Sequence, residues 1–301
     1  MAYTFTELLD NIKTRGMIPT SQSTYTQARF LVMVNDEIRS YIVPLIMRCR
    51  ENYFSYDIDT DINSTGIYDI STRAMGSKAQ NAALINGTER QDLSWISEEE
   101  LISTDQTPTG KPGVYFKRNQ IVLVPPTDHG YGTFRQTIFL RPCEVVAQES
   151  AAVITAINTG TKTVTCTTVP STWTTSNTFE LVQANPHFDS LSIDQTITAV
   201  VTGSSGTITF TDTLPSRLAV GDWVGLAGQS PIIQLPLEGH ALLSQRVANQ
   251  CLKNSPHTKA YETGVKEAES LEKALTGLIS PRMEKEGKKV YSRNGMLRRG
   301  M

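Results

Sequence analysis

The chain changes composition twice along its length, and this divides it into helix-forming ends and a strand-forming interior. Between residues 151 and 230 the only basic residues are Lys162 and Arg217, among many Thr, Ser and Val residues. Thr and Val favour strands because their branched Cβ fits the pleated backbone. Alternating runs separated by Gly, Asn and Pro predict five or six short strands in a small barrel or sandwich, closed by the run Gly221–Gly225. Residues 145–232 are therefore expected to form an inserted β domain.

The first fifty residues have the period of helices. A capping box precedes apolar residues at helical spacing over residues 5–12, and Gly16 is expected to end this helix in a left-handed conformation. Thr24 and Gln27 form a second capping box before a long apolar face. Pro44 is expected to kink that helix or to restart it as a first-turn residue, because proline lacks the amide that the helical ladder needs.

Strand patterns follow the first helices, and helical patterns return after residue 236. Ser71 to Ile85 indicates a short helix and a strand, and residues 114–117, 120–124 and 133–140 indicate a three-stranded meander. In the last helices two apolar faces are expected, comprising Leu242, Leu243, Val247, Cys251 and Leu252, and then Val265, Ala268, Leu271, Leu275 and Leu278. The helices at the two ends are expected to pack together, with the β domain projecting from them.

These patterns predict an α+β fold, namely a helical body with a small β meander and an inserted β-barrel or sandwich domain. The expected divisions are a helical body with the meander over 1–144, the inserted domain over 145–232, closing helices over 233–280 and an extended basic arm over 281–301.

Composition argues against several functional classes. The formal charge of −2 does not suit a nucleic-acid clamp, no apolar run reaches the length of a membrane span, and no secretory signal is visible. Four widely spaced cysteines without a CxxC pair indicate free thiols in a reducing compartment. The chain lacks phosphate-loop, nucleophile-elbow and zinc-protease motifs, so we expect neither an enzyme nor a cofactor or metal.

Two clusters of charge stand out. The last twenty residues hold seven basic and two acidic side chains, with apolar residues between them, which is typical of an arm that becomes ordered on a partner. Acidic residues alternate along the strand that begins at Tyr56. They resemble a calcium loop but lack its glycine and its final glutamate, so a polar strand face is the favoured interpretation. The acidic candidates are Asp57, Asp59, Asp61, Glu98, Glu99 and Glu100.

Several short motifs occur in order along the chain. In the N-terminal segment they are Ile18–Gln22 (IPTSQ), Asn35–Glu37 (NDE), Ile42–Met47 (IVPLIM) and Arg50–Phe54 (RENYF), and later they are Ser71–Gly76, Gln120–Pro126 and Ser292–Arg299. In these motifs the chain resembles the head-to-tail adaptor (connector or neck ring) proteins of tailed bacteriophages, with the N-terminal segment similar to their helical start. The resemblance covers residues 1–142 and 235–301, and the domain at 145–232 departs from it.

The resemblance implies a ring, commonly of twelve subunits, that joins the portal to the tail and lines the channel for double-stranded DNA in the virion neck. The implied partners are the portal ring, tail or nozzle proteins and further copies of the chain, with no membrane and with synthesis in the host cytoplasm. The acidic candidates would line the lumen or a subunit interface. The C-terminal arm would dock between portal subunits through Lys288, Lys289, Val290, Tyr291, Arg293, Leu297, Arg298 and Arg299.

Two other functions remain open. The basic tail could bind DNA phosphates directly, in which case binding would fall steeply with salt. The β domain could instead bind host or tail components, with Trp173, Trp223 and Phe179 stacking on sugars, although aromatic residues in such a domain are more often part of the core.

Overall fold

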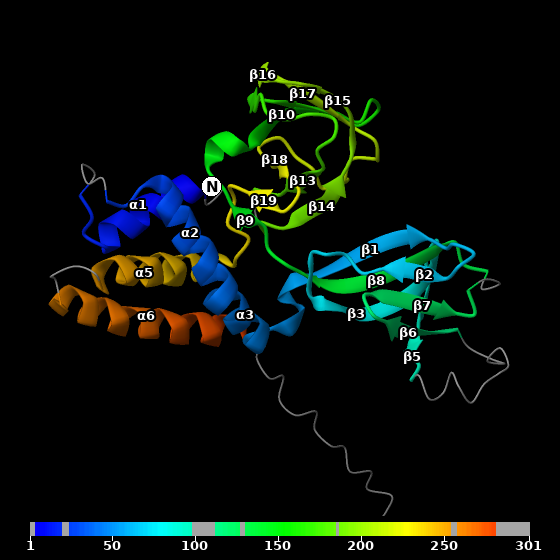
Figure 1. Cartoon of the computed structure of the whole chain (residues 1–301), viewed down its shortest axis with the longest axis horizontal. Coiled ribbons are helices and arrows are strands. Elements are labelled where there is room, and N and C mark those ends of the chain that lie inside the picture. The colour runs from blue at the N-terminus through cyan, green and yellow to red at the C-terminus, as the bar shows by residue number, and fades with distance from the viewer. Residues whose placement is uncertain are drawn as a thin grey trace, which may run out of the picture.

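The computed structural model describes residues 4–19, 24–97, 112–126, 130–184, 187–253 and 258–280. It is a mixed α+β structure, with helices from both ends of the chain on one side and strands in several sheets (Figure 1). The helical segments are α1 (Phe5–Arg15), α2 (Gln27–Glu37), a π-helical turn (Ile38–Ile42), α3 (Val43–Cys49), short 3₁₀ turns (Glu51–Phe54, Gln148–Ser150), α5 (Leu237–Lys253) and α6 (Thr258–Ile279).

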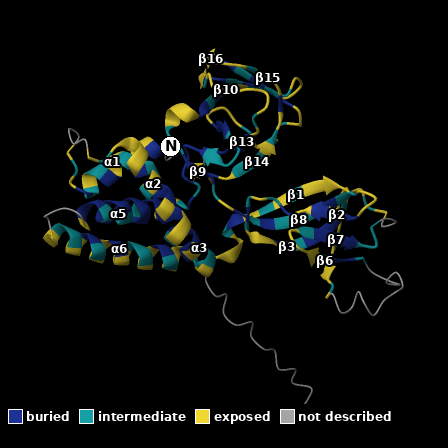
Figure 2. Ribbon diagram, viewed as in Figure 1, coloured by how far each residue is buried: buried dark blue, intermediate teal, exposed yellow. Residues whose placement is uncertain are grey.

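The first and last helices share one hydrophobic core, which confirms the expectation that the two ends pack together. Phe5, Leu8 and Ile12 of α1 and Phe30 of α2 are fully buried against Leu242, Leu243 and Val247 of α5. α5 is buried along most of its length, because α1 and α2 lie against it on one side and α6 on the other (Figure 2). The expected apolar face of α6 is shorter than predicted, since Leu278 is 67% exposed.

The helix boundaries differ from expectation in two places. Gly16 has a right-handed conformation (φ −81°), and the left-handed residue that turns the chain is Met17 (φ 51°). The second cap is Thr26, whose side chain accepts a hydrogen bond from the Arg29 amide at 3.3 Å, because α2 begins two residues later than predicted. Pro44 lies in the first turn of α3, as expected, directly after the π-helical turn.

Residues 55–140 form two packed four-stranded sheets with their own core. One sheet has the order β1-β8-β3-β4 and the other β2-β7-β6-β5. Phe134 and Ile138 of β8 pack between the sheets with Leu84, Ile121 and Leu123. The strands are β1 (Ser55–Asp61), β2 (Ile67–Asp69), β3 (Ala74–Asn86), β4 (Glu89–Asp92), β5 (Ser94–Trp95), β6 (Gly113–Lys117), β7 (Gln120–Val124) and β8 (Thr133–Leu140).

The prediction of a three-stranded meander is therefore wrong, although all three predicted strands are present. β6 and β7 form a hairpin, but β8 crosses to the other sheet and pairs with β1 and β3. Alternating polarity marks a strand without specifying its partner, and here β8 buries its apolar face by completing the opposite layer. The helix expected after Ser71 is also absent, since the chain turns directly into β3.

Residues 152–226 form a seven-stranded sheet in the order β14-β13-β18-β10-β11-β17-β15, with no ladder between its end strands in the described residues. β18 lies in the middle of the sheet, so the Gly221–Gly225 run does not close a barrel. Its strands are β10 (Ala152–Asn158), β11 (Thr163–Cys166), β13 (Phe179–Val182), β14 (Ser190–Gln195), β15 (Ile197–Val201), β17 (Thr207–Phe210) and β18 (Trp223–Leu226). β12 (Thr168–Val169) pairs with β16 (Gly203–Ser204).

A short parallel pair anchors this β unit to the helices. β9 (Glu144–Val145), where the chain enters the β unit, pairs with β19 (Gln229–Ser230), where the chain leaves it. The buried Asn35 side chain donates to the Val145 carbonyl at 2.9 Å and accepts from the Val145 amide at 2.8 Å. These two hydrogen bonds satisfy a buried backbone unit that would otherwise cost free energy. Asn35, one of the residues in the adaptor-like motif, thus has a structural role.

Candidate functional site

The alternating acidic residues lie where the sequence analysis placed them, on a strand with one polar face. Asp57, Asp59 and Asp61 point to the exposed face of β1, while Tyr56 and Ile58 pack against the core of the two sheets. β1 is an edge strand of its sheet and is exposed over most of its length (Figure 2). The acidic residues therefore form the polar face of an exposed strand, as predicted, and do not form a calcium-binding loop.

Arg135 on the neighbouring strand β8 partly neutralises this acidic row. Its guanidinium donates two hydrogen bonds to Asp59, at 2.6 and 2.7 Å, and lies 3.5 Å from Asp57. The hydrogen bonds to Asp59 are the main reason that the pKa of Arg135 is raised. Thr137 donates to Asp57 at 2.6 Å. Asp61 has no ion-pair partner in the described part of the chain.

The acidic character extends across the same sheet face. The register aligns Asp59 with Arg135, Ala83 and then Asp92, and the next row aligns Asp61 with Thr133, Ile85 and then Arg90. Four carboxylates on this face therefore oppose two guanidinium groups. A sheet face with excess negative charge repels phosphate groups and gives a duplex no point of attachment.

The remaining predicted site residues lie outside the described residues. They are the acidic candidates Glu98, Glu99 and Glu100 and the docking candidates Lys288, Lys289, Val290, Tyr291, Arg293, Leu297, Arg298 and Arg299.

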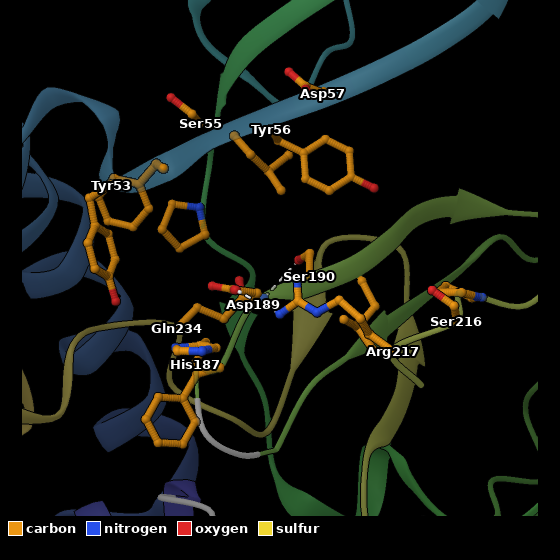
Figure 3. Close-up of a pocket in the computed structure, with 16 residues that line it drawn as sticks. Tyr53, Ser55, Tyr56, Asp57, His187, Asp189, Ser190, Ser216, Arg217 and Gln234 are labelled. Carbon is orange, nitrogen blue, oxygen red and sulfur yellow. Dashed lines mark hydrogen bonds and ion pairs between the residues drawn. The ribbon is translucent and has the colours of Figure 1, made fainter. Parts of the chain in front are cut away.

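A cleft of about 550 Å³ separates β1 from the inserted unit, at a position that sequence reasoning did not identify. Tyr53 and Tyr56 line one side, and Asp189, Ser190 and Arg217 line the other (Figure 3). Burial raises the pKa of Tyr56 to about 12 and the pKa of Tyr53 well above its usual range, so both hydroxyls stay protonated at neutral pH. Arg217 lies 3.5 Å from Asp189. The cleft can therefore donate hydrogen bonds from both walls.

A buried ion pair joins the two β units behind this cleft. The Glu180 carboxylate has no solvent exposure and accepts hydrogen bonds from Arg73 at 2.6 Å and from the Gly228 amide at 2.9 Å. Ser190 also donates to Glu180, and Gln234 donates to Ser190 at 2.8 Å. The only local sign of this buried ion pair in the sequence is the acidic residue Glu180 within the apolar run Phe179–Val182. This network fixes how the inserted unit sits against β3.

The described residues offer little support for sugar stacking or metal binding. Trp173, Trp223 and Phe179 are all at least 96% buried, so they belong to the core as the alternative interpretation predicted. Burial also lowers the pKa of His240 to about 4, with Phe188 packed against its ring. No group of three metal-ligand side chains occurs within the described ranges.

No helix within the described ranges combines the length and the apolar character needed to cross a membrane. No protein-family model matches the chain, and a search of the curated proteins gives no significant match.

Proposed function

We propose that this chain is a structural virion protein that forms a ring, with twelve subunits as the favoured number, between the portal and the tail of a tailed bacteriophage. The observation that carries the proposal is the exposed acidic face of the β1 sheet, in a chain whose ends resemble head-to-tail adaptors. Such a ring lies in the virion neck after synthesis in the host cytoplasm.

An acidic wall suits a channel through which DNA must move without being held. Each basic residue that contacts a phosphate releases counterions and stabilises the complex, and a ring multiplies every such contact by its number of subunits. Carboxylates at Asp57, Asp59 and Asp61 have the opposite effect, because they repel the phosphates and leave the duplex free to slide. Arg135 is held by two of these carboxylates and is thus less available to DNA.

The basic segment 281–301 is proposed as the arm that docks on the portal. It follows α6 directly, and its Arg and Lys side chains suit acidic grooves, since charge complementarity provides specificity at an interface. Val290, Tyr291 and Leu297 would contribute the apolar burial.

For residues 145–232 we propose a barrel-like unit that contacts neighbouring subunits or tail proteins. The two end strands of its sheet, β14 and β15, are separated only by Thr196, which supports a sheet that curls until its ends meet. A second candidate function, binding to a host or tail component through this unit, is favoured by the cleft beside Arg217.

Co-sedimentation with the portal ring encoded alongside this chain tests the proposal. The full-length chain should co-sediment, and a chain truncated after Ser280 should not. Binding that survives truncation would retain the adaptor function and remove the docking role of the arm. If neither form binds, the adaptor proposal fails and the second candidate takes its place.

A further inference from the structure

Strand β1 has an unused backbone edge. The Ile62 amide donates to the Gly132 carbonyl at 3.1 Å, and the β1–β8 register continues from this pair. Bonded and non-bonded pairs alternate in an antiparallel ladder, so residues 56, 58 and 60 direct their backbone groups towards β8. The amides and carbonyls of Asp57, Asp59 and Asp61 must point the other way. No strand covers that side within the described residues.

This edge opens onto the cleft. Residues 55–57 line the cleft on one side, and the beginning of β14, another edge strand, lines the opposite side. Tyr56 and Arg217 project into the space between them (Figure 3). An extended segment added to β1 would therefore have its end bounded by side chains from both β units. This is the arrangement used when a peptide adds a strand to a sheet edge.

The side chains of β1 determine which segment fits. Residues of an added strand that lie beside Asp57, Asp59 and Asp61 would share the outer face with three carboxylates, and Asp61 has no ion-pair partner in the described part of the chain. Residues at alternate positions would lie beside Tyr56, which lines the cleft, and Ile58, which packs against the core. Directly adjacent cross-strand pairs of opposite charge are favourable, and like charges are unfavourable. The carboxylates thus favour a basic strand and repel an acidic one.

We infer that the free edge of β1 binds an extended segment of a partner protein in which basic and apolar residues alternate, by addition as a further strand. The inference goes beyond the proposed ring, because it concerns the backbone edge of β1 and would hold for the isolated chain. Within the proposed neck, the partner would be a tail protein.

Hydrogen exchange of the full-length chain with a seven-residue peptide of alternating Lys and Val tests this inference. The peptide should protect the amides of Asp57 and Asp59, whose hydrogens have no ladder partner among the described residues. A peptide with Glu in place of Lys should not protect them. A Lys-Val peptide methylated on alternate backbone nitrogens should bind at least roughly tenfold more weakly, because it loses the donors that the ladder requires.

Substitution of Asp61 measures the charge contribution without disturbing Arg135. Asp61→Asn should weaken peptide binding by roughly two- to fivefold, the range for an exposed ion pair. Asp212→Asn makes the same change of charge on the inserted unit and should leave binding unchanged.

Three results would overturn the inference. They are absence of protection at Asp57 and Asp59, equal binding of the methylated or the Glu-containing peptide, and protection of the same amides by self-association of the chain without peptide. The last result would assign the edge to contacts between copies. None of these results depends on portal binding, so they are separable from failure of the proposed function.

Discussion

Glu180 is the buried charge on which the junction between the two β units depends. Its partner Arg73 is 13% exposed, and burial of both side chains strengthens their interaction while making a lone charge costly. The Glu180→Gln substitution should therefore lower the free energy of unfolding by about 3 kcal/mol, because it leaves the Arg73 cation without its counter-charge. Urea unfolding measures this difference.

The matched control is Asp59→Asn, which also removes a carboxylate hydrogen-bonded to an arginine. Asp59 and Arg135 are 46% and 27% exposed, so solvent screens their attraction. The expected loss is below about 1 kcal/mol. Equal losses for the two variants would show that burial does not distinguish the two ion pairs.

His240 should give the protein a measurable dependence of stability on pH. Burial holds its pKa at about 4, against 6.5 for an exposed histidine, so the folded state stays neutral while the unfolded state takes up a proton. Stability from this group is complete above pH 6.5 and is lost as the pH falls towards 4. Between pH 7 and 5.5 the loss should be about 1 kcal/mol.

His240→Gln isolates this contribution. The difference in unfolding free energy between wild type and variant should shrink as the pH falls from 7 to 5.5, because the variant cannot take up the proton. A difference that stays constant over this range would mean that His240 is protonated equally in both states.

The packing of α5 against α6 depends on a glycine. A Cβ added to Gly264 would lie 2.2 Å from Oδ1 of Asn249 and 2.9 Å from Nε2 of Gln245, whose side chains are hydrogen-bonded to each other in the interface. Gly264→Ala should thus destabilise the protein by about 1–3 kcal/mol through overpacking. Thermal or urea unfolding provides the measurement.

Gly277 in the same helix is the control. A Cβ there meets nothing within 4 Å, so Gly277→Ala should be neutral or should stabilise by up to about 1 kcal/mol through helix propensity. Destabilisation by both substitutions would indicate an effect on α6 itself, and close packing at Gly264 would not explain it.

Helical segments were predictable from sequence to a greater degree than strand pairing. The apolar faces of α1 and α5 follow from local spacing. Each backbone amide of a helix bonds to the carbonyl four residues earlier, so residues three or four positions apart share one face. Whether β8 pairs with β7 or with β1 depends on residues some eighty positions apart, and alternation contains no information on that choice. The position of Met17 in a left-handed turn was likewise not visible, because Gly16 is the residue type that normally takes it.

The acidic part of the candidate site was predictable, and its surroundings were not. Alternation placed Asp57, Asp59 and Asp61 on one strand face, but their contact with Arg135 required the register of β8. The cleft and the Arg73–Glu180 pair lie between units that are far apart in the sequence, so no local pattern could reveal them.

In the proposed ring, the charge of the β1 face should control whether DNA is retained. Replacing Asp57, Asp59 and Asp61 together by Lys should cause rings bound to portal to retain a short duplex at 50 mM salt, with retention lost steeply as salt increases. The wild-type ring should not retain the duplex. Filter binding over a salt series provides the measurement.

Replacement of Glu149, Asp194 and Asp212 by Lys serves as the control, since it makes the same change of charge on exposed positions of the inserted unit. This control should leave DNA retention low. Equal retention by both triple variants would place the β1 face outside the channel.

The mass and symmetry of the complex with the portal test the central proposal most directly. Native mass spectrometry and electron microscopy of purified portal mixed with the full-length chain should show one closed ring of this protein on each portal, with twelve subunits. A portal that carries no ring, or scattered copies without rotational symmetry, would contradict the proposal that this chain is a neck adaptor.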